Sequence, residues 1–194
     1  MPSGFTPVAT NTNTSDVDSC VSIGKDTAGR HLKTSGGVAI GQAVYGTSHT
    51  SDLDLDASVL IGKNVFPIAA VDGLAEDTIA IGKDICTTTY NQTVNDSVLI
   101  GSECCTTLTE GKNTVIGAHA LKNASNVANY VTAVGFGAGQ DCTGVGTGAV
   151  IIGRNACRNN SSGAFTIGSN AIIIGTGPVD GHTAPTADSI TIGR

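Results

Sequence analysis

A four-residue segment that ends in Ile-Gly or Val-Gly recurs along the 194-residue chain, and such a recurrence restricts the fold to an array of similar units. Successive copies lie 17, 21, 20, 19, 16, 18, 18, 15 and 25 residues apart. A constant motif joined by connections of variable length is typical of a solenoid, in which insertions fall in loops. The ten copies end at Gly24, Gly41, Gly62, Gly82, Gly101, Gly117, Gly135, Gly153, Gly168 and Gly193.

Each copy has the alternation of a β-strand. Ile or Val precedes the glycine, and a β-branched or aromatic residue lies two positions earlier, so that both share one face. We expect this face to point into the coil, which gives a predicted structural core of Ile23, Ile40, Ile61, Ile81, Ile100, Ile116, Val134, Ile152, Ile167 and Ile192. The residues between them, such as Leu60 and Ile151, are also often apolar. Both faces of the strand should therefore be covered, the outer one by a partner chain.

The motif glycines are the predicted corners of the coil. Asn or Asp often stands two residues after the glycine, as in Lys63-Asn64-Val65 and Lys83-Asp84-Ile85. Glycine adopts positive φ without strain, and Asn or Asp can bond its own backbone, so the pair is suited to a turn. Little favours helix, and only residues 118–129 could form a short helical turn.

Composition and charge restrict the partners. The chain has 26 glycines, 4% aromatic residues, no tryptophan and 13% charged residues, which suits thin layers rather than a wide core. A net charge of -6, with only ten scattered Lys and Arg, argues against nucleic acid. No apolar run approaches the ~18 residues of a membrane span, and the first residues resemble no export signal, so neither membrane nor export is expected.

Two regions differ in composition. Residues 1–18 are polar and lack the motif, which predicts an N-terminal extended arm, either a linker or a segment that docks on a partner. Residues 19–194 form the predicted solenoid, with a capping strand at 188–194 after a Gly/Pro/Thr loop.

The motif resembles known repeats. Ile-Gly-x-[Asn/Asp]-[Ala/Val/Ile], preceded by [Asn/Asp]-Ser-Val-x, is similar to the head repeats of trimeric autotransporter adhesins and to the β-helical shafts of bacteriophage tail fibres and spikes. The resemblance covers Ser19 to Gly193 and implies a homotrimer. We therefore predict an all-β fold: a parallel β-solenoid of about ten short coils, homotrimeric and roughly 50 Å tall.

The same resemblance sets the expected function. The chain should be a virion structural protein of a bacteriophage, assembled in the host cytoplasm, that acts as a short tail fibre, spike or capsid decoration (cement) protein. Its partners should be further copies of itself and other capsid or tail proteins, contacted through the arm. The alternative is an adhesin-like module that binds a host surface receptor through loops 42–57, 86–95 and 176–187.

No catalytic, cofactor or metal residue is predicted. The acids Asp72, Glu76, Asp77, Glu103 and Glu110 show no pairing of the kind that a glycan-cleaving enzyme needs, so an enzyme is not expected. Asp52–Asp56 lacks the glycine and glutamate of a calcium loop. The cations that follow motif glycines predict a solvated charge ladder: Lys25, Lys63, Lys83, Arg154 and Arg194.

The six cysteines have no zinc-type spacing. Cys86, Cys105 and Cys157 each stand four residues after a motif glycine, which predicts one column of the stack. Two states remain open for them: buried free thiols, or a bridge between Cys86 and Cys105 in successive coils. The remaining three are Cys20, Cys104 and Cys142.

Overall fold

The computed structural model is all-β. It describes residues 17–18, 21–25, 32–44, 53–54, 56–66, 76–87, 94–108, 110–159, 164–177 and 185–193. Within these ranges there is no helix, and 118–123 form turns rather than the helical turn that the sequence allowed. Accordingly, no helix among the described residues has the length and apolarity needed to cross a membrane.

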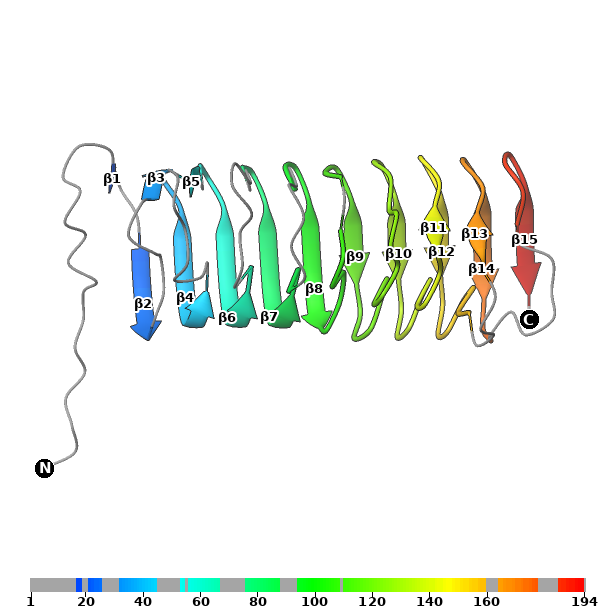
Figure 1. Cartoon of the computed structure of the whole chain (residues 1–194), viewed down its shortest axis with the longest axis horizontal. Helices are drawn as coiled ribbons and strands as arrows, with labels where there is room; N and C mark the ends of the chain where they lie inside the picture. Colours follow the sequence, from blue (N-terminus) through cyan, green and yellow to red (C-terminus); the bar gives the residue numbers. More distant parts are fainter. Residues whose placement is uncertain are drawn as a thin grey trace, which may run out of the picture.

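One ten-stranded parallel sheet, here called the main sheet, runs the length of the molecule in sequence order. Figure 1 shows its strands side by side along the molecule, and the connections between successive strands are here called return segments. Its strands are β2 (Val21–Lys25), β4 (Val38–Val44), β6 (Val59–Val65), β7 (Ile79–Ile85), β8 (Val98–Ser102), β9 (Thr114–Ile116), β10 (Thr132–Val134), β12 (Val150–Ile152), β14 (Ile172–Gly175) and β15 (Ile190–Gly193). The prediction of a parallel β-solenoid is therefore confirmed.

Two smaller parallel sheets form on other sides of the coils. β1 (Val17–Asp18), β3 (Leu32–Ser35) and β5 (Leu53–Asp54) make one, and β11 (Gly144–Val145) with β13 (Thr166–Ile167) makes the other. Val17 pairs with Thr34, so the paired structure begins inside the segment predicted as an arm. Residues 1–16 of that arm lie outside the described residues.

The motif stacks upon itself without slippage. In every pair of neighbouring main-sheet strands whose glycines are both in the ladder, glycine lies opposite glycine, as Gly62 lies opposite Gly82. The residue before the glycine likewise lies opposite its counterpart, as Ile81 lies opposite Ile100. Variable connection lengths therefore leave the register unchanged, and the extra residues lie in the return segments.

One predicted copy of the motif is not part of the main sheet. Thr166–Ile167 forms β13, which pairs with β11 on another side of the coil, and Gly168 follows it there. The main-sheet strand of this coil is β14, which ends in Ile174-Gly175. With Gly175 in place of Gly168, the glycine spacings of 15 and 25 become 22 and 18. The assignment of Ile167 and Gly168 to the repeat column is therefore wrong.

Eight of the ten main-sheet glycines are required by contact as well as by conformation, the exceptions being Gly175 and Gly193. All of them except Gly175 have φ between 123° and 150°, a region that side chains disfavour. A Cβ added to any of them from Gly24 to Gly175 would lie within 3.0 Å of the next main-sheet glycine's backbone. The strands therefore approach one another at this column in a way that no other residue permits.

The inside of the coil is lined by the residues between the motif's branched positions. These middle residues are at most 7% exposed: Ala39, Leu60, Ala80, Leu99, Val115, Ala133, Ile151 and Ile173. A second inner column lies three residues after the glycine: Val44, Val65, Ile85, Cys104, Ala120, Ala138 and Ala156. At some levels the two columns compensate in size, since Ala80 precedes Ile85 whereas Leu99 precedes Cys104.

The predicted orientation of the repeat core is consequently wrong. The residues before the glycines lie on the opposite side of the strand from the buried middle residues, and none of them is buried. Alternation shows which residues share a face but not which face is inside. The coil is narrow, so the column that includes several alanines is the one that fits inside. The misassigned residues are Ile23, Ile40, Ile61, Ile81, Ile100, Ile116, Val134, Ile152 and Ile192.

A ladder of buried polar side chains supports the turn before the strand. Ser58, Thr78, Ser97 and Asn113 are each at most 1% exposed. The Ser58 hydroxyl accepts a hydrogen bond from the Thr78 N–H at 3.1 Å. The Ser97 hydroxyl accepts one from the Asn113 N–H, and the Asn113 side-chain oxygen one from the Val131 N–H. Ser58, Ser97 and Asn113 thus each satisfy a buried donor one coil further on, whereas the Thr78 hydroxyl donates to the Val94 carbonyl.

Replacement of Gly82 by alanine should destabilise the fold far more than the same change at Gly36. Both have positive φ, but an added Cβ at Gly82 meets the Gly101 backbone, whereas at Gly36 it meets nothing within 4 Å. We expect Gly82→Ala to lower the free energy of unfolding by more than about 3 kcal/mol and Gly36→Ala by about 1 kcal/mol. Urea titrations followed by circular dichroism at one protein concentration measure both, and equal losses would contradict the contact argument.

Candidate interaction surface

The outward side of the main sheet is a continuous apolar surface, here called the outer face. It consists of the residues one and three positions before each glycine, in two columns that run along the solenoid. Ile79 and Ile116, in the middle of the array, are 39% and 37% exposed, so the exposure is not confined to the terminal strands. The columns are Val21, Val38, Val59, Ile79, Val98, Thr114, Thr132, Val150, Ile172 and Ile190, and Ile23, Ile40, Ile61, Ile81, Ile100, Ile116, Val134, Ile152, Ile174 and Ile192.

The outer face is large for a surface left in water. Each of the twenty side chains covers about 4.8 Å by about 7 Å of the sheet, which gives the outer face an area on the order of 650 Å². The largest apolar patch of a typical monomer covers about 300–600 Å² and is often functional. Eighteen of the twenty positions here are Ile or Val, with Thr114 and Thr132 as the exceptions. Such an uninterrupted surface is typical of a contact with another protein.

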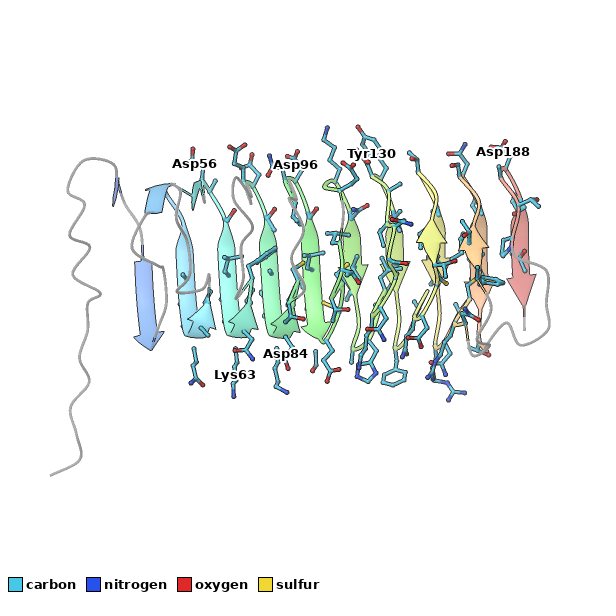
Figure 2. All side chains as sticks on the ribbon, viewed as in Figure 1. Asp56, Lys63, Asp84, Asp96, Tyr130 and Asp188 are labelled. Carbon is cyan, nitrogen blue, oxygen red and sulfur yellow. The ribbon has the colours of Figure 1, made fainter. Side chains whose placement is uncertain are left out.

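Two rows of residues, most of them exposed, border the outer face. The leading ridge is formed by the residues two positions before each strand, and the trailing ridge by the residues that follow each main-sheet glycine. Figure 2 shows Asp96, Tyr130 and Asp188 at one end of the strands and Lys63 at the other. The leading ridge is Gly36, Ala57, Asp77, Asp96, Lys112, Tyr130, Gly148, Asn170 and Asp188; the trailing ridge is Gln42, Lys63, Lys83, Ser102, Ala118, Phe136, Arg154 and Thr176.

The two ridges differ in charge. Three of the four charged residues of the leading ridge are acids, with Lys112 as the exception. All charged residues of the trailing ridge are cations, namely Lys63, Lys83 and Arg154. Every leading-ridge residue has positive φ, from 50° at Asp77 to 75° at Gly36, which Asp and Asn tolerate better than most residues. The positive φ at these turn positions therefore favours Asp and Asn, and the Asp residues make the ridge acidic.

Each ridge also carries one exposed aromatic ring. Tyr130, on the leading ridge, is 57% exposed, and Phe136, on the trailing ridge, is 47% exposed. The Lys112 amine lies 5.6 Å from the Tyr130 ring centroid, and the His119 ring lies 5.3 Å from the Phe136 ring. Both aromatic residues flank the same strand, β10, so they lie at the same level of the solenoid.

Behind the trailing ridge, side chains form ion pairs and amide hydrogen bonds, some of them between neighbouring coils. Asp84 accepts a hydrogen bond from the Asn64 amide at 2.7 Å and contacts the Lys83 amine at 2.9 Å, and these contacts lower the pKa of its carboxyl. Glu103 forms an ion pair with Lys122, which holds the pKa of Glu103 below its usual value. Of the predicted charge ladder, Lys83 thus pairs with Asp84 of its own coil, whereas the bonds between coils join Asn64 to Asp84 and Glu103 to Lys122.

The five described cysteines are free and buried. Burial raises the pKa of Cys104 and of Cys157 to about 12, and it raises the pKa values of Cys86, Cys105 and Cys142 as well. Cys86 and Cys105 have the same left-handed backbone, with φ of 49° and 47°, at equivalent positions of successive coils. Of the two predicted states, the structure has the free thiols; Cys20 lies outside the described residues.

The acids considered for an enzyme are not gathered at one place. Asp77 lies on the leading ridge beside Glu76, whereas Glu103 lies behind the trailing ridge in its ion pair with Lys122. Asp72 lies outside the described residues. Among the residues that the structure does describe, no three His, Cys, Asp or Glu side chains are placed to hold a metal ion. The loops of the receptor-binding alternative are described only in part.

No protein-family model, curated protein or solved structure matches the chain. The resemblance to adhesin head repeats and phage shafts therefore stays a prediction. The outer face and its ridges are the features that bear on function.

The buried thiols predict a loss of stability at alkaline pH. Unfolding returns each thiol to a pKa near 9, so above that pH the unfolded chain loses protons that the folded chain retains, and the free energy of unfolding falls as pH rises toward 12. One thiol contributes up to about 1.4 kcal/mol per pH unit. Cys104→Ala, which introduces the residue found at Ala120 and Ala138, should reduce the slope by that amount in urea titrations between pH 8 and 10.5.

The same pH dependence in the wild type and in Cys104→Ala would contradict the burial of this thiol. The comparison removes the contributions that all other groups make equally in both chains.

Proposed function

We propose that the chain is a structural protein: a rigid β-solenoid whose copies associate through the outer face into a homotrimer. In this proposal the trimer is a short fibre, spike or capsid-decorating knob of a bacteriophage virion. The outer face is the single observation that carries the self-association. The number of three chains per assembly and the virion location are inferred from the resemblance of the motif to phage shafts and adhesin heads.

The energetics favour coverage of the outer face. Full burial of one Val or Ile side chain stabilises by roughly 1.5–3 kcal/mol relative to exposure. The side chains of the outer face are half-buried or exposed within one chain. Even a fraction of 1 kcal/mol from each of the eighteen Ile and Val residues would offset the entropy lost on association, which is estimated at 4–15 kcal/mol.

The interior of one coil is too thin to provide rigidity by itself. Its middle column alternates between large residues, such as Leu60, and small ones, such as Ala80. Packing of the outer faces against one another would add a second apolar layer parallel to the first, with the main sheet between them. A shaft built in this way resists bending because every strand is bonded along the axis and packed on both sides.

A cation on the outer face should dissociate the assembly without unfolding the chain. We expect wild-type protein at micromolar concentration to scatter light as a trimer and Ile81→Lys to scatter as a monomer, because a buried unpaired amine costs several kcal/mol. The Ser125→Lys variant is the matched control: Ser125 is exposed on a return segment, so its change should leave the trimer intact. Circular dichroism checks that all three proteins keep their β spectrum.

A wild-type chain that stays monomeric under these conditions would contradict the proposal. So would an Ile81→Lys variant that keeps both its β spectrum and the wild-type mass.

The virion location has its own test. Antibodies raised against the purified chain should decorate phage particles from its source in electron micrographs, at the capsid or at the tail. Absence of the chain from purified particles, shown by mass spectrometry of their proteins, would contradict the virion role and leave the trimer itself unaffected.

A further inference from the structure

We propose that Cys86 and Cys105 form a two-coordinate site for a soft divalent metal ion of the Hg²⁺ type, which replaces the two thiol protons and bridges successive coils. The site is independent of the proposed self-association, because both cysteines lie inside one chain. Three features support it: the register of the two residues, the spacing of their sulfur atoms and their apolar surroundings.

The two cysteines occupy equivalent places in neighbouring coils. Figure 1 shows β7 and β8 side by side; they pair glycine to glycine, and each cysteine stands four residues after its glycine. The Glu103 N–H donates to the Lys83 carbonyl at 2.7 Å, so the two coils remain in register toward the cysteines. Cys86 and Cys105 also have nearly the same φ, 49° and 47°. Their side chains therefore start from equivalent backbone positions, one above the other.

The spacing of the coils suits a bridging metal ion better than a disulfide. Equivalent atoms of neighbouring strands lie about 4.8 Å apart, so sulfur atoms in the same rotamer repeat at this distance. A disulfide requires about 2.05 Å between its sulfur atoms, whereas two metal–sulfur bonds of about 2.3 Å in a straight line span about 4.6 Å. Burial and then the charges of Cys86 and Cys104 raise the pKa of Cys105, as expected for neighbouring sulfur atoms.

The surroundings select the kind of ion. Thiolates bind soft metal ions. Cys86 and Cys105 are 9% and 1% exposed, and buried Phe66 and Leu121 continue their column on either side. Among the described residues no third His, Cys, Asp or Glu completes a metal site with them, so an ion that needs four ligands does not fit. A divalent ion that binds two thiolates in line forms a neutral unit, which leaves no unpaired charge in the apolar interior.

Binding exchanges two protons for the metal ion without any change of oxidation state. Both S–H bonds break, each sulfur atom forms one bond to the ion, and the two protons pass to water. Cys86 is the more exposed of the two residues, so the ion reaches the pair from its side. The product is a bridge that joins the coil of β7 to the coil of β8.

The other described cysteines have no such partner in their own column. Cys104 stands three residues after its glycine, where the neighbouring coils carry Ile85 and Ala120. The Cys142 thiol donates to the Cys157 carbonyl at 3.2 Å, but these two residues stand seven and four positions after their glycines. Replacement of Cys104 or Cys142 therefore provides matched controls.

Retention of mercury against a monothiol tests the proposal. The reduced full chain receives one equivalent of HgCl₂ and is dialysed against excess 2-mercaptoethanol, and the remaining metal is measured by elemental analysis. We expect the wild type, Cys104→Ala and Cys142→Ala to retain the ion. Cys86→Ala and Cys105→Ala should each bind it about 10²-fold more weakly or worse, because a single protein thiolate has no advantage over the monothiol. Circular dichroism checks that each variant keeps its β spectrum.

X-ray absorption at the mercury edge gives a second measurement, which needs no variant and so decides even where a variant does not fold. The wild type with one equivalent of HgCl₂ should show two sulfur neighbours at about 2.3 Å. One sulfur neighbour, or three or more, would overturn the proposal. Retention of the ion by folded Cys86→Ala or Cys105→Ala would overturn it as well, and so would its loss from the wild type or from folded Cys104→Ala.

Discussion

The close approach of main-sheet strands at the glycine column is the constraint on which the rest of the structure depends. A Cβ at Gly41 or Gly82 would lie where the next glycine's carbonyl group lies, so only glycine lets successive coils stack at this height. Gly41 lies within β4 with φ of 140°, and the pairing of this strand continues beyond the glycine as far as Val44. One residue type therefore sets both the spacing and the register of the strands.

The glycine column also determines which side chains lie inside the coil. With the glycine fixed, the middle residue of the motif and the residue three positions after the glycine meet within the coil, as Leu60 and Val65 do. The interior is narrow, so alanine fits it at several levels, and the residues one and three positions before the glycine lie outside. The result is a sheet with an apolar layer on both sides. A single chain covers only one of them, and the outer face gives this fold its strongest reason to associate.

Much of this fold could be predicted from the sequence, and the remainder could not for definite reasons. The recurrence of Ile-Gly indicates the parallel stack and its register, because the same residues return at each level. Period-two alternation does not show which face of a strand points into the coil, however, so the predicted inward direction of Ile61 and Ile81 was wrong. The choice of Gly168 over Gly175 failed because two Ile-Gly segments lie in one coil and only pairing distinguishes them. The left-handed corner at Asn64 had a sequence signal, whereas those at Phe66 and Leu121 had none, since they result from the stack rather than from local preference.

The most direct test of this account is the accessibility of isoleucine methyl groups in solution. In a chain with labelled isoleucine methyls, a soluble paramagnetic agent broadens the signals of those that water reaches. The account predicts that Ile61, Ile81 and Ile100 on the outer face are protected nearly as well as Ile85 and Ile151 inside the coil, because neighbouring copies cover them. Strong broadening of the outer set beside a protected inner set would show that the face remains in water and would contradict the account.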